Sequence, residues 1–295
     1  MEMIIAVASG KGGTGKTTVA VNLAKVLPGP VQLLDCDVEE PNAHLFLHGE
    51  LKEQKVVSIP VPEVDEVFCD GCGECGRFCR YHAIVSLKTE PLIFPELCHG
   101  CGGCVRVCPI EAIRERDRRI GVVERLRSGD ITLLQGRLDV GESMAPPLIR
   151  AVKARIRPGV PAILDAPPGT SCPVITTLRG ADFIVLVTEP TPFGLHDLKL
   201  AVESIRQMAI PFGVVINRVG AGDDRVHAYC KAGRIPILLE IPDDRRIAEA
   251  YSRGDLLVEA LPEYREHFLN LGRRILSKRE ILHRSRLEAA TAAMI

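Results

Sequence analysis

Gly10-Lys11-Gly12-Gly13-Thr14-Gly15-Lys16-Thr17-Thr18 is the stretch that decides the fold of this chain. A short apolar run at residues 3–8 precedes it, and apolar residues at helical spacing follow it over residues 19–27. The stretch fits G-x-x-x-x-G-K-[ST], the phosphate-binding loop of nucleotide hydrolases. Its glycines let backbone N–H groups surround the phosphates, and the following helix turns its positive end toward the same anion. We expect Lys16 to reach the β- and γ-phosphates and the Thr17 hydroxyl to bind Mg²⁺.

Two further predicted strands end in acidic residues. The apolar runs at residues 31–34 and 162–164 lead into Asp35-Cys36-Asp37 and into Asp165. Carboxylates at the carboxyl end of a strand beside the phosphate loop lie where Mg²⁺ and the attacking water must be. Asp165 matches the Walker B position, at which a carboxylate binds Mg²⁺ through water.

Strands and helices alternate through the rest of the chain. Further strands are predicted at residues 131–134, 181–188, 212–218 and 235–241, and helices at residues 146–155 and 196–208. This alternation predicts an α/β fold with a doubly wound, mostly parallel sheet, as in P-loop NTPases.

A cysteine-rich segment lies between a predicted extra strand at residues 55–59 and a charged stretch at residues 114–119. It contains two runs with the same spacing, 29 residues apart: Cys69, Cys72, Cys75 and Cys79, then Cys98, Cys101, Cys104 and Cys108. This is the pattern of bacterial ferredoxins with two [4Fe–4S] clusters, in which the fourth cysteine of each run ligates the other cluster. It assigns one cluster to Cys69, Cys72, Cys75 and Cys108, and the other to Cys98, Cys101, Cys104 and Cys79.

Zinc is the alternative for these cysteines, because structural zinc sites also use Cys-x₂-Cys pairs. Third and fourth cysteines at fixed spacing, present twice, favour the clusters. The first run departs from the usual pattern, since Arg80 follows Cys79 where such ferredoxins have proline. We predict a small α+β ferredoxin domain at residues 63–117, inserted in a discontinuous ATPase domain of residues 1–62 and 118–295.

Lys11 lies ahead of the glycine pair and makes the pattern K-G-G-x-G-K-T-T. On this motif, and on the Asp165-x-Pro-Pro-Gly segment, the chain resembles the MinD/ParA/Mrp group of ATPases, which includes the nitrogenase iron protein. The resemblance covers essentially the whole chain and implies an ATPase that forms a homodimer on ATP, with Lys11 contacting the partner subunit's nucleotide. It also implies that Asp37 positions or activates the attacking water.

The resemblance assigns further contacts to the nucleotide and its metal. Asp35 would support the magnesium shell, with capping of the following turn as the alternative. Asn217 would hydrogen-bond the adenine edge, although an asparagine that ends a strand is often a turn former. The loop around Pro242-Asp243 would flank the base. The implied cofactors are ATP, Mg²⁺ and two [4Fe–4S] clusters.

The composition is that of a globular protein. The chain has 295 residues, of which 46% are hydrophobic and 25% charged, and its net charge of −1 predicts no nucleic-acid partner. No apolar run approaches the ~18 residues that span a bilayer, so we expect no membrane segment, and a cytoplasmic location. Eleven cysteines in that compartment predict metal ligands rather than disulfides.

Three cysteines outside the two runs, Cys36, Cys172 and Cys230, are expected to be small buried hydrophobic residues. Cys172 follows the Pro-Pro-Gly segment, so it has an alternative role as a ligand at a dimer axis. From Pro262 the chain is predicted to be helical to its end. Residues 273–286 alternate basic and apolar side chains, and we favour a helix packed on the sheet over one that binds a membrane surface.

Three functions are compatible with these features. The leading one is a dimeric ATPase that couples its nucleotide state to electron transfer or to redox-dependent binding of an unidentified partner. The second is an iron–sulfur cluster assembly or carrier ATPase. The third is a positioning ATPase of the MinD type with a structural ferredoxin domain.

Overall fold

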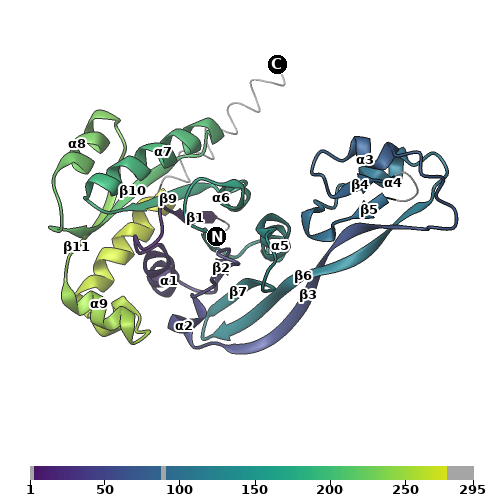
Figure 1. Ribbon diagram of the computed structural model, residues 1–295. Helices are drawn as coiled ribbons and strands as arrows, with labels where there is room; N and C mark the ends of the chain where they lie inside the picture. Colours follow the sequence, from purple (N-terminus) through teal and green to yellow (C-terminus); the bar gives the residue numbers. More distant parts are fainter. Residues whose placement is uncertain (1–2, 88–90, 278–295) are drawn as a thin grey trace, which may run out of the picture.

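The computed structural model describes residues 3–87 and 91–277. Its centre is a nine-stranded sheet in the order β11-β10-β9-β1-β8-β2-β7-β6-β3, with helices on both faces (Figure 1). Seven neighbouring strands are parallel: β1 (Ile4–Ala8), β2 (Val31–Asp35), β7 (Ile131–Leu138), β8 (Ala162–Asp165), β9 (Phe183–Thr188), β10 (Phe212–Val219) and β11 (Ile237–Pro242). The predicted doubly wound, mostly parallel α/β sheet is confirmed.

Two helical layers bury the two faces of this sheet. One layer contains α5 (Ala145–Lys153), α6 (Cys172–Leu178), α7 (Pro192–Met208) and α8 (Arg225–Ala232). The other contains α1 (Lys16–Val26), α2 (His44–Leu47), α10 (Leu257–Ala260) and the helical residues 265–277, with α9 (Arg245–Ser252) at its margin. Because both faces are covered, the central strands are nearly continuous apolar runs rather than alternating ones.

The order of the strands positions the phosphate loop. From β1 the chain passes to β2 on one side, and the later strands β9, β10 and β11 are added on the other side. Ligands of open α/β sheets bind at the carboxyl ends of the strands where the chain reverses in this way. The loop between β1 and α1 lies at this point of reversal.

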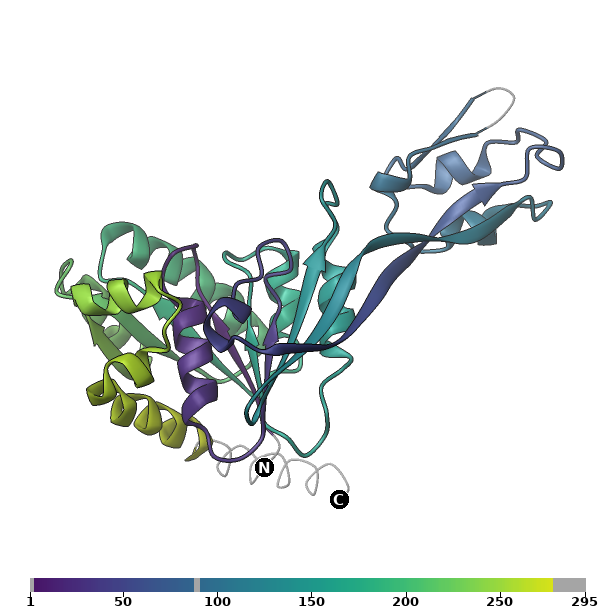
Figure 2. The same ribbon diagram turned by 90° about the horizontal axis from the view of Figure 1, so that it is seen from below.

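A long antiparallel pair of strands projects from one edge of the sheet (Figure 2). β3 (Glu50–Val64) pairs with β6 (Ile113–Ser128) along its whole length, whereas β6 pairs with β7 only from Gly121 onward. Residues 58–64 and 113–119 therefore form a two-stranded ribbon that extends about 23 Å beyond the sheet, at ~3.3 Å per residue. The predicted strand at 55–59 and the charged stretch at 114–119 are parts of this pair, and the expected boundaries at 62/63 and 117/118 fall within it.

Pro60 and Pro62 fit this strand because β3 is an edge strand. They are two residues apart, so both lack an N–H on the same edge, the one that faces away from β6. The cysteine-rich segment packs against this edge instead, since a Cβ on Gly100 would lie 3.2 Å from the carbonyl oxygen of Pro60.

The cysteine-rich segment folds into a small module at the end of the ribbon (Figure 1). α3 (Glu74–Phe78) and α4 (Gly103–Val107) are related by the 29-residue repeat, and β4 (Ile84–Ser86) pairs with β5 (Pro91–Ile93). Equivalent residues of the two halves share positive φ angles: Gly71 and Gly100, Gly73 and Gly102, His82 and Glu111. The module has its own apolar cluster, in which Ile84 and Ile113 pack with Cys75 and Cys104.

The C-terminal helix packs on the sheet as far as the structure describes it. A short 3₁₀ turn, Pro262–Tyr264, precedes it, and Phe268, Leu271 and Ile275 are fully buried. The rest of the predicted basic helix, residues 278–286, lies outside the described residues. Within the described ranges, no helix combines the length and the apolar character needed to cross a bilayer.

Candidate functional site

The phosphate loop adopts the expected backbone. Gly13 and Gly15 have φ angles of 77° and 91°, which L side chains rarely adopt. A Cβ at Gly15 would also lie 2.5 Å from the amide nitrogen of Asn217. Lys16 begins α1 and is only 7% exposed. The loop therefore presents its N–H groups and one lysine to a common space, as phosphate binding requires.

A pocket of about 420 Å³ opens in front of this loop. Its walls come from five parts of the chain: Gly12 to Thr18, Asp37 to Asn42, Pro168 of the Pro-Pro-Gly segment, Asn217-Arg218, and residues 241–257. The loop residues Gly12, Gly13, Gly15, Lys16, Thr17 and Thr18 line it together with Asp37, Asn217, Pro242 and Asp243. The structure thus brings together residues that are more than 200 positions apart in the sequence.

Two carboxylates lie side by side at the ends of adjacent strands. Asp35 of β2 is in register with Asp165 of β8, and both are buried. Asp35 accepts backbone N–H groups from Asp37 (3.1 Å), Asn42 (2.9 Å) and Ala43 (3.0 Å). These bonds confirm that Asp35 caps the following turn, and its support of the magnesium shell stays a prediction.

Asp165 is in a different environment. Its two carboxyl oxygens are buried without a hydrogen-bond partner among the described residues. Burial, with the charge of Asp35 adding to it, raises the pKa of Asp165 to about 8, while Thr17 and Lys16 oppose the rise. Burial likewise raises the pKa of Asp37 to about 6. An unpartnered buried carboxylate beside a threonine hydroxyl fits a Mg²⁺ ion, which would favour the ionised form.

Lys11 is held by its own chain. Its ammonium lies 3.0 Å from one carboxyl oxygen of Glu189, and the other oxygen is 2.8 Å from the Arg218 guanidinium. Glu189 directly follows β9, at the same edge of the sheet as Asp37 and Asp165. The sequence reasoning missed this residue, although its position after an apolar strand was a usable signal.

Asn217 contacts the phosphate loop. Its side-chain nitrogen donates to the Thr14 carbonyl oxygen (2.9 Å), and its side-chain oxygen accepts the Arg218 N–H (3.0 Å). It lines the pocket in front of the loop together with Asp243, while Ile247 and Tyr251 of α9 supply an apolar wall. The adenine contact expected of Asn217 stays a prediction.

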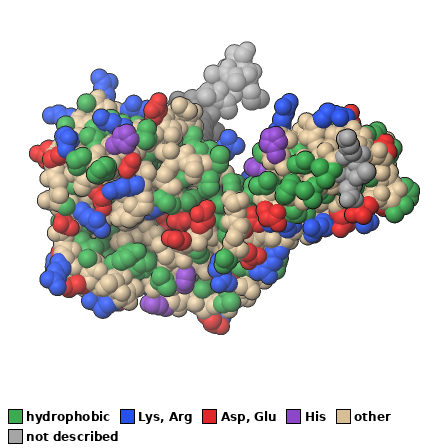
Figure 3. Space-filling model, viewed as in Figure 1, with side chains coloured by type: hydrophobic (Ala, Val, Ile, Leu, Met, Phe, Trp, Pro, Cys, Tyr) green, Lys and Arg blue, Asp and Glu red, His purple; other side chains and the backbone are tan. Residues whose placement is uncertain are grey.

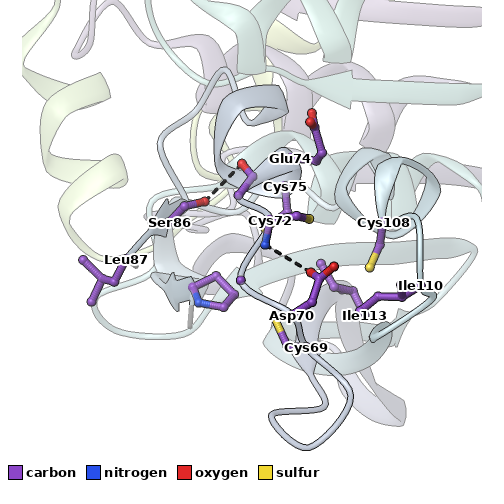
Figure 4. Close-up of a pocket in the computed structure, with 13 residues that line it drawn as sticks. Cys69, Asp70, Cys72, Glu74, Cys75, Ser86, Leu87, Cys108, Ile110 and Ile113 are labelled. Carbon is purple, nitrogen blue, oxygen red and sulfur yellow. Dashed lines mark hydrogen bonds between the residues drawn. The ribbon is translucent and has the colours of Figure 1, made fainter. Parts of the chain in front are cut away.

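The eight cysteines of the module line two pockets. Cys69, Cys72, Cys75 and Cys108 line the first (Figure 4), and Cys79, Cys98, Cys101 and Cys104 line the second. Each pocket thus contains three cysteines of one run and the last cysteine of the other. In Figure 4 the sulfur atoms of Cys75 and Cys108 approach the first pocket from facing sides. Within the described residues, no group of three or more His, Cys, Asp or Glu side chains is placed so that it could hold a metal ion.

Backbone N–H groups point at two of the thiols. The Gly100 N–H donates to the sulfur of Cys98 at 3.4 Å, and the Ala112 N–H donates to the sulfur of Cys108 at 3.3 Å. Such bonds stabilise thiolates, the form that binds iron. The second pocket is also lined by Pro60, Pro62 and Glu115, so it lies against the ribbon. The donor set and its N–H partners fit iron–sulfur clusters.

The three remaining cysteines differ in exposure. Cys36 and Cys230 are fully buried, as expected. Cys172, at the start of α6, is exposed, so the expectation of a buried hydrophobic residue is wrong there. Gly169, which precedes it, turns at a φ of 93° and donates its N–H to the Ser9 carbonyl. This bond ties the Pro-Pro-Gly segment to the end of β1, and Cys172 follows it at the surface.

Several known proteins are similar to this chain in sequence or in fold. Residues 5–258 match the family described as CobQ/CobB/MinD/ParA nucleotide binding domain. An uncharacterized protein of Methanocaldococcus jannaschii is 31% identical over 279 residues, which cover 91% of this chain and 97% of that protein. The iron-sulfur cluster carrier protein of Aquifex aeolicus is 27% identical over 278 residues, covering 88% of this chain and 63% of that protein. The septum site-determining protein MinD of Pyrococcus horikoshii OT3, solved with Mg-ADP, has a TM-score of 0.56 at 21% identity over 93% of this chain and 96% of its own.

Proposed function

Because the chain belongs to the CobQ/CobB/MinD/ParA nucleotide-binding family, we propose that it is a dimeric ATPase whose nucleotide state is coupled to two [4Fe–4S] clusters. The clusters would serve electron transfer or redox-dependent binding of a partner. The observation that carries this proposal is the division of the eight cysteines between two pockets. That division is the one required when each cluster takes its fourth ligand from the other run.

The residues around the nucleotide pocket have separable roles in hydrolysis. Lys16 and the N–H groups of the glycine loop would bind the phosphates, and Thr17 with Asp165 would hold Mg²⁺, which neutralises charge on the phosphates. Asp37 lines the same pocket, and its carboxylate would orient the attacking water by accepting a hydrogen bond. Lys11 would contact the partner subunit's nucleotide, so hydrolysis would need two copies of the chain.

The clusters cannot sense the nucleotide by direct contact within one chain, because the ribbon places the module beyond the sheet (Figure 2). A bonded path runs between them instead. The N–H of Leu138, at the end of β7, donates to the carbonyl oxygen of Val38, next to Asp37 (2.9 Å). Asp139 then pairs with Arg119 of the ribbon (2.8 Å), and Glu142 pairs with Arg118. This path supports coupling between the Asp37 segment and the ribbon.

Exposed apolar side chains on the module favour binding of a redox partner there. Hydrophobic side chains gather on the face of the module seen in Figure 3. Val67 and Phe68, directly before Cys69, are 89% and 70% exposed, and Ile110 at the rim of the first pocket is 42% exposed. Such exposure near a cluster ligand is typical of a surface that docks a partner.

ATP turnover by the cluster-loaded protein tests the proposal. Turnover would be measured anaerobically with the clusters oxidised, reduced and removed by chelation. We expect the rate to differ by several-fold between the oxidised and reduced forms, because a coupling of ~1 kcal/mol changes an equilibrium about fivefold. Equal rates in all three states would refute the coupling and leave the clusters a structural role.

A cluster-carrier function is the second candidate, and the name of the Aquifex aeolicus relative favours it. Cys72 and Cys101, equivalent positions of the two runs, are exposed, so an acceptor has access to each pocket. Transfer of a cluster to an apo-acceptor protein would support this candidate. Retention of both clusters in the presence of the acceptor would exclude it.

A further inference from the structure

Glu189 joins two cations, one from the phosphate loop and one from the end of β10. Its carboxylate is only 8% exposed, and each of its oxygens faces one cation: Lys11 of the phosphate loop at 3.0 Å and Arg218 at 2.8 Å. Arg218 directly follows Asn217, has a φ of 55°, and lines the pocket. Glu189 itself does not line the pocket. It therefore acts on the nucleotide only through the two cations.

The backbone beneath Glu189 is held tightly. A Cβ on Gly194 would collide with the carbonyl oxygen of Glu189, and a Cβ on Gly222 would collide with that of Pro190. The Pro190 carbonyl also accepts the Asp223 N–H at 2.9 Å. The backbone that carries this carboxylate is therefore closely packed against the Gly194 and Gly222 backbones.

In the ATP-dependent homodimer of the proposed function, Lys11 would exchange the Glu189 carboxylate of its own chain for a nucleotide held by the other subunit. Resting on the ATP-dependent homodimer of the proposed function, we propose that Glu189 is a positioning residue that retains Lys11 within its own chain until ATP brings two copies together. When Lys11 leaves, Arg218 remains on Glu189, so the nearly buried carboxylate keeps one cation. Without Arg218, the release of Lys11 would leave a buried charge unpaired, which is strongly unfavourable.

The retention of Lys11 opposes dimer formation. Any free energy that stabilises the Lys11–Glu189 pair in the single chain must be given up on dimerisation. Each dimer exchanges two lysines, one from each chain. A change in the equilibrium for releasing Lys11 from Glu189 therefore enters the dimer dissociation constant as its square. If the partly exposed ion pair shifts this release equilibrium about threefold in each chain, the dimer dissociation constant changes about tenfold.

Sedimentation equilibrium of the cluster-loaded full chain, with MgADP and then with a non-hydrolysable MgATP analogue, tests this proposal. The variants are Glu189→Gln, Lys11→Ala and the double variant. Glu266→Gln is the matched control, because Glu266 pairs with Arg273 at 2.8 Å on the C-terminal helix and both side chains are exposed. Glu189→Asp is a second variant, which keeps the charge but shortens the side chain by one methylene, in case the glutamine variant fails to fold.

We expect Glu189→Gln to lower the dimer dissociation constant about tenfold with the MgATP analogue, and Glu189→Asp to lower it less. The control should match the wild type, and the double variant should match Lys11→Ala, because Glu189 acts through Lys11. Two results would overturn the role of Glu189 without affecting the proposed dimer. One is a dimer dissociation constant that is unchanged in both Glu189 variants. The other is tighter dimerisation of the double variant than of Lys11→Ala. A wild-type chain that stays monomeric with the analogue would overturn the dimer of the proposed function, and this inference with it.

Discussion

The N–H of Leu138 donates to the carbonyl oxygen of Val38 across 2.9 Å, and this bond joins the segment that contains Asp37 to the strand that leads toward the ribbon. Val38 also packs closely on β7, since a Cβ on Gly136 would lie 2.5 Å from its side chain. A shift of Asp37 toward a bound nucleotide would therefore move the end of β7. The loop that follows β7 is ion-paired to the base of the ribbon, which gives the movement a route to the module.

Glu142→Gln should uncouple the nucleotide pocket from the clusters of the module. Its ion pair with Arg118 is largely buried, since the side chains of Glu142 and Arg118 are 5% and 17% exposed. This pair therefore connects the loop after β7 to the ribbon. We expect the variant to keep ATP turnover within about twofold of wild type but to lose most of the effect of cluster oxidation state on turnover. Glu63→Gln, which breaks an exposed pair with Arg114 on the ribbon itself, is the control and should behave as wild type. Equal redox sensitivity in both variants would contradict this path.

The stability of the protein without Mg²⁺ and nucleotide should fall as the pH rises. Burial raises the pKa of Asp35 from 3.8 to about 6 and that of Asp165 from 3.8 to about 8. Between pH 3.8 and about 8, the folded chain therefore binds more protons than the unfolded chain. Stability then decreases from about pH 4 to about pH 8, by at most ~1.4 kcal/mol per pH unit for each carboxyl that titrates. Urea unfolding of the wild type and of Asp165→Asn measures this slope.

The asparagine variant should show a smaller fall in stability over this range, because it removes one of the two neighbouring carboxyls whose pKa burial raises. A wild-type stability that rises over this range, or an unchanged slope in the variant, would show that these carboxyls are ionised in the folded state without Mg²⁺.

Gly15→Ala and Gly12→Ala form a matched pair in the phosphate loop. Gly15 has a φ of 91°, and a Cβ there would meet the Asn217 amide at 2.5 Å, whereas a Cβ on Gly12 meets nothing within 4 Å. We expect the alanine at 15 to reduce the free energy of unfolding by roughly 1–3 kcal/mol and the alanine at 12 to leave it nearly unchanged. Thermal unfolding without nucleotide makes the comparison, and equal losses in the two variants would contradict the loop geometry.

Paired cysteine substitutions test how the ligands are divided. Cys79→Ser with Cys101→Ser removes two ligands from one pocket, whereas Cys79→Ser with Cys72→Ser removes one from each. We expect the first double variant to keep one cluster and the second to lose or weaken both, as measured by iron content and by the EPR spectrum of the reduced protein. If each run held its own cluster, the two results would be exchanged.

The parallel core and its loop could be predicted from the sequence because each element carries its own local signal. The spacing of the glycines from Gly10 to Gly15 predicts a phosphate loop. Buried strands such as residues 183–188 are almost entirely apolar because helices cover both faces of the sheet. The spacing of the cysteines also predicted how they divide between two pockets, since a repeated backbone places equivalent residues in equivalent positions.

The ribbon and Glu189 could not be predicted in this way. Residues 114–119 are charged on both faces because the ribbon projects into solvent, so the alternation that indicates a half-buried strand is missing. Glu189 gains its role only from Lys11 and Arg218, which are far from it in the sequence. Cys172 is exposed, and no local sequence pattern distinguishes it from a buried cysteine such as Cys230.

The most direct test of coupling between nucleotide and clusters is an anaerobic redox titration of the cluster-loaded protein, first with MgADP and then with MgATP. A shift of about 59 mV for a one-electron cluster corresponds to a tenfold change in equilibrium, or roughly 1.4 kcal/mol of coupling. We expect a shift of this order in the wild type and none in Lys11→Ala, which cannot contact the partner subunit's nucleotide. Identical titrations of the wild type with the two nucleotides would contradict the account.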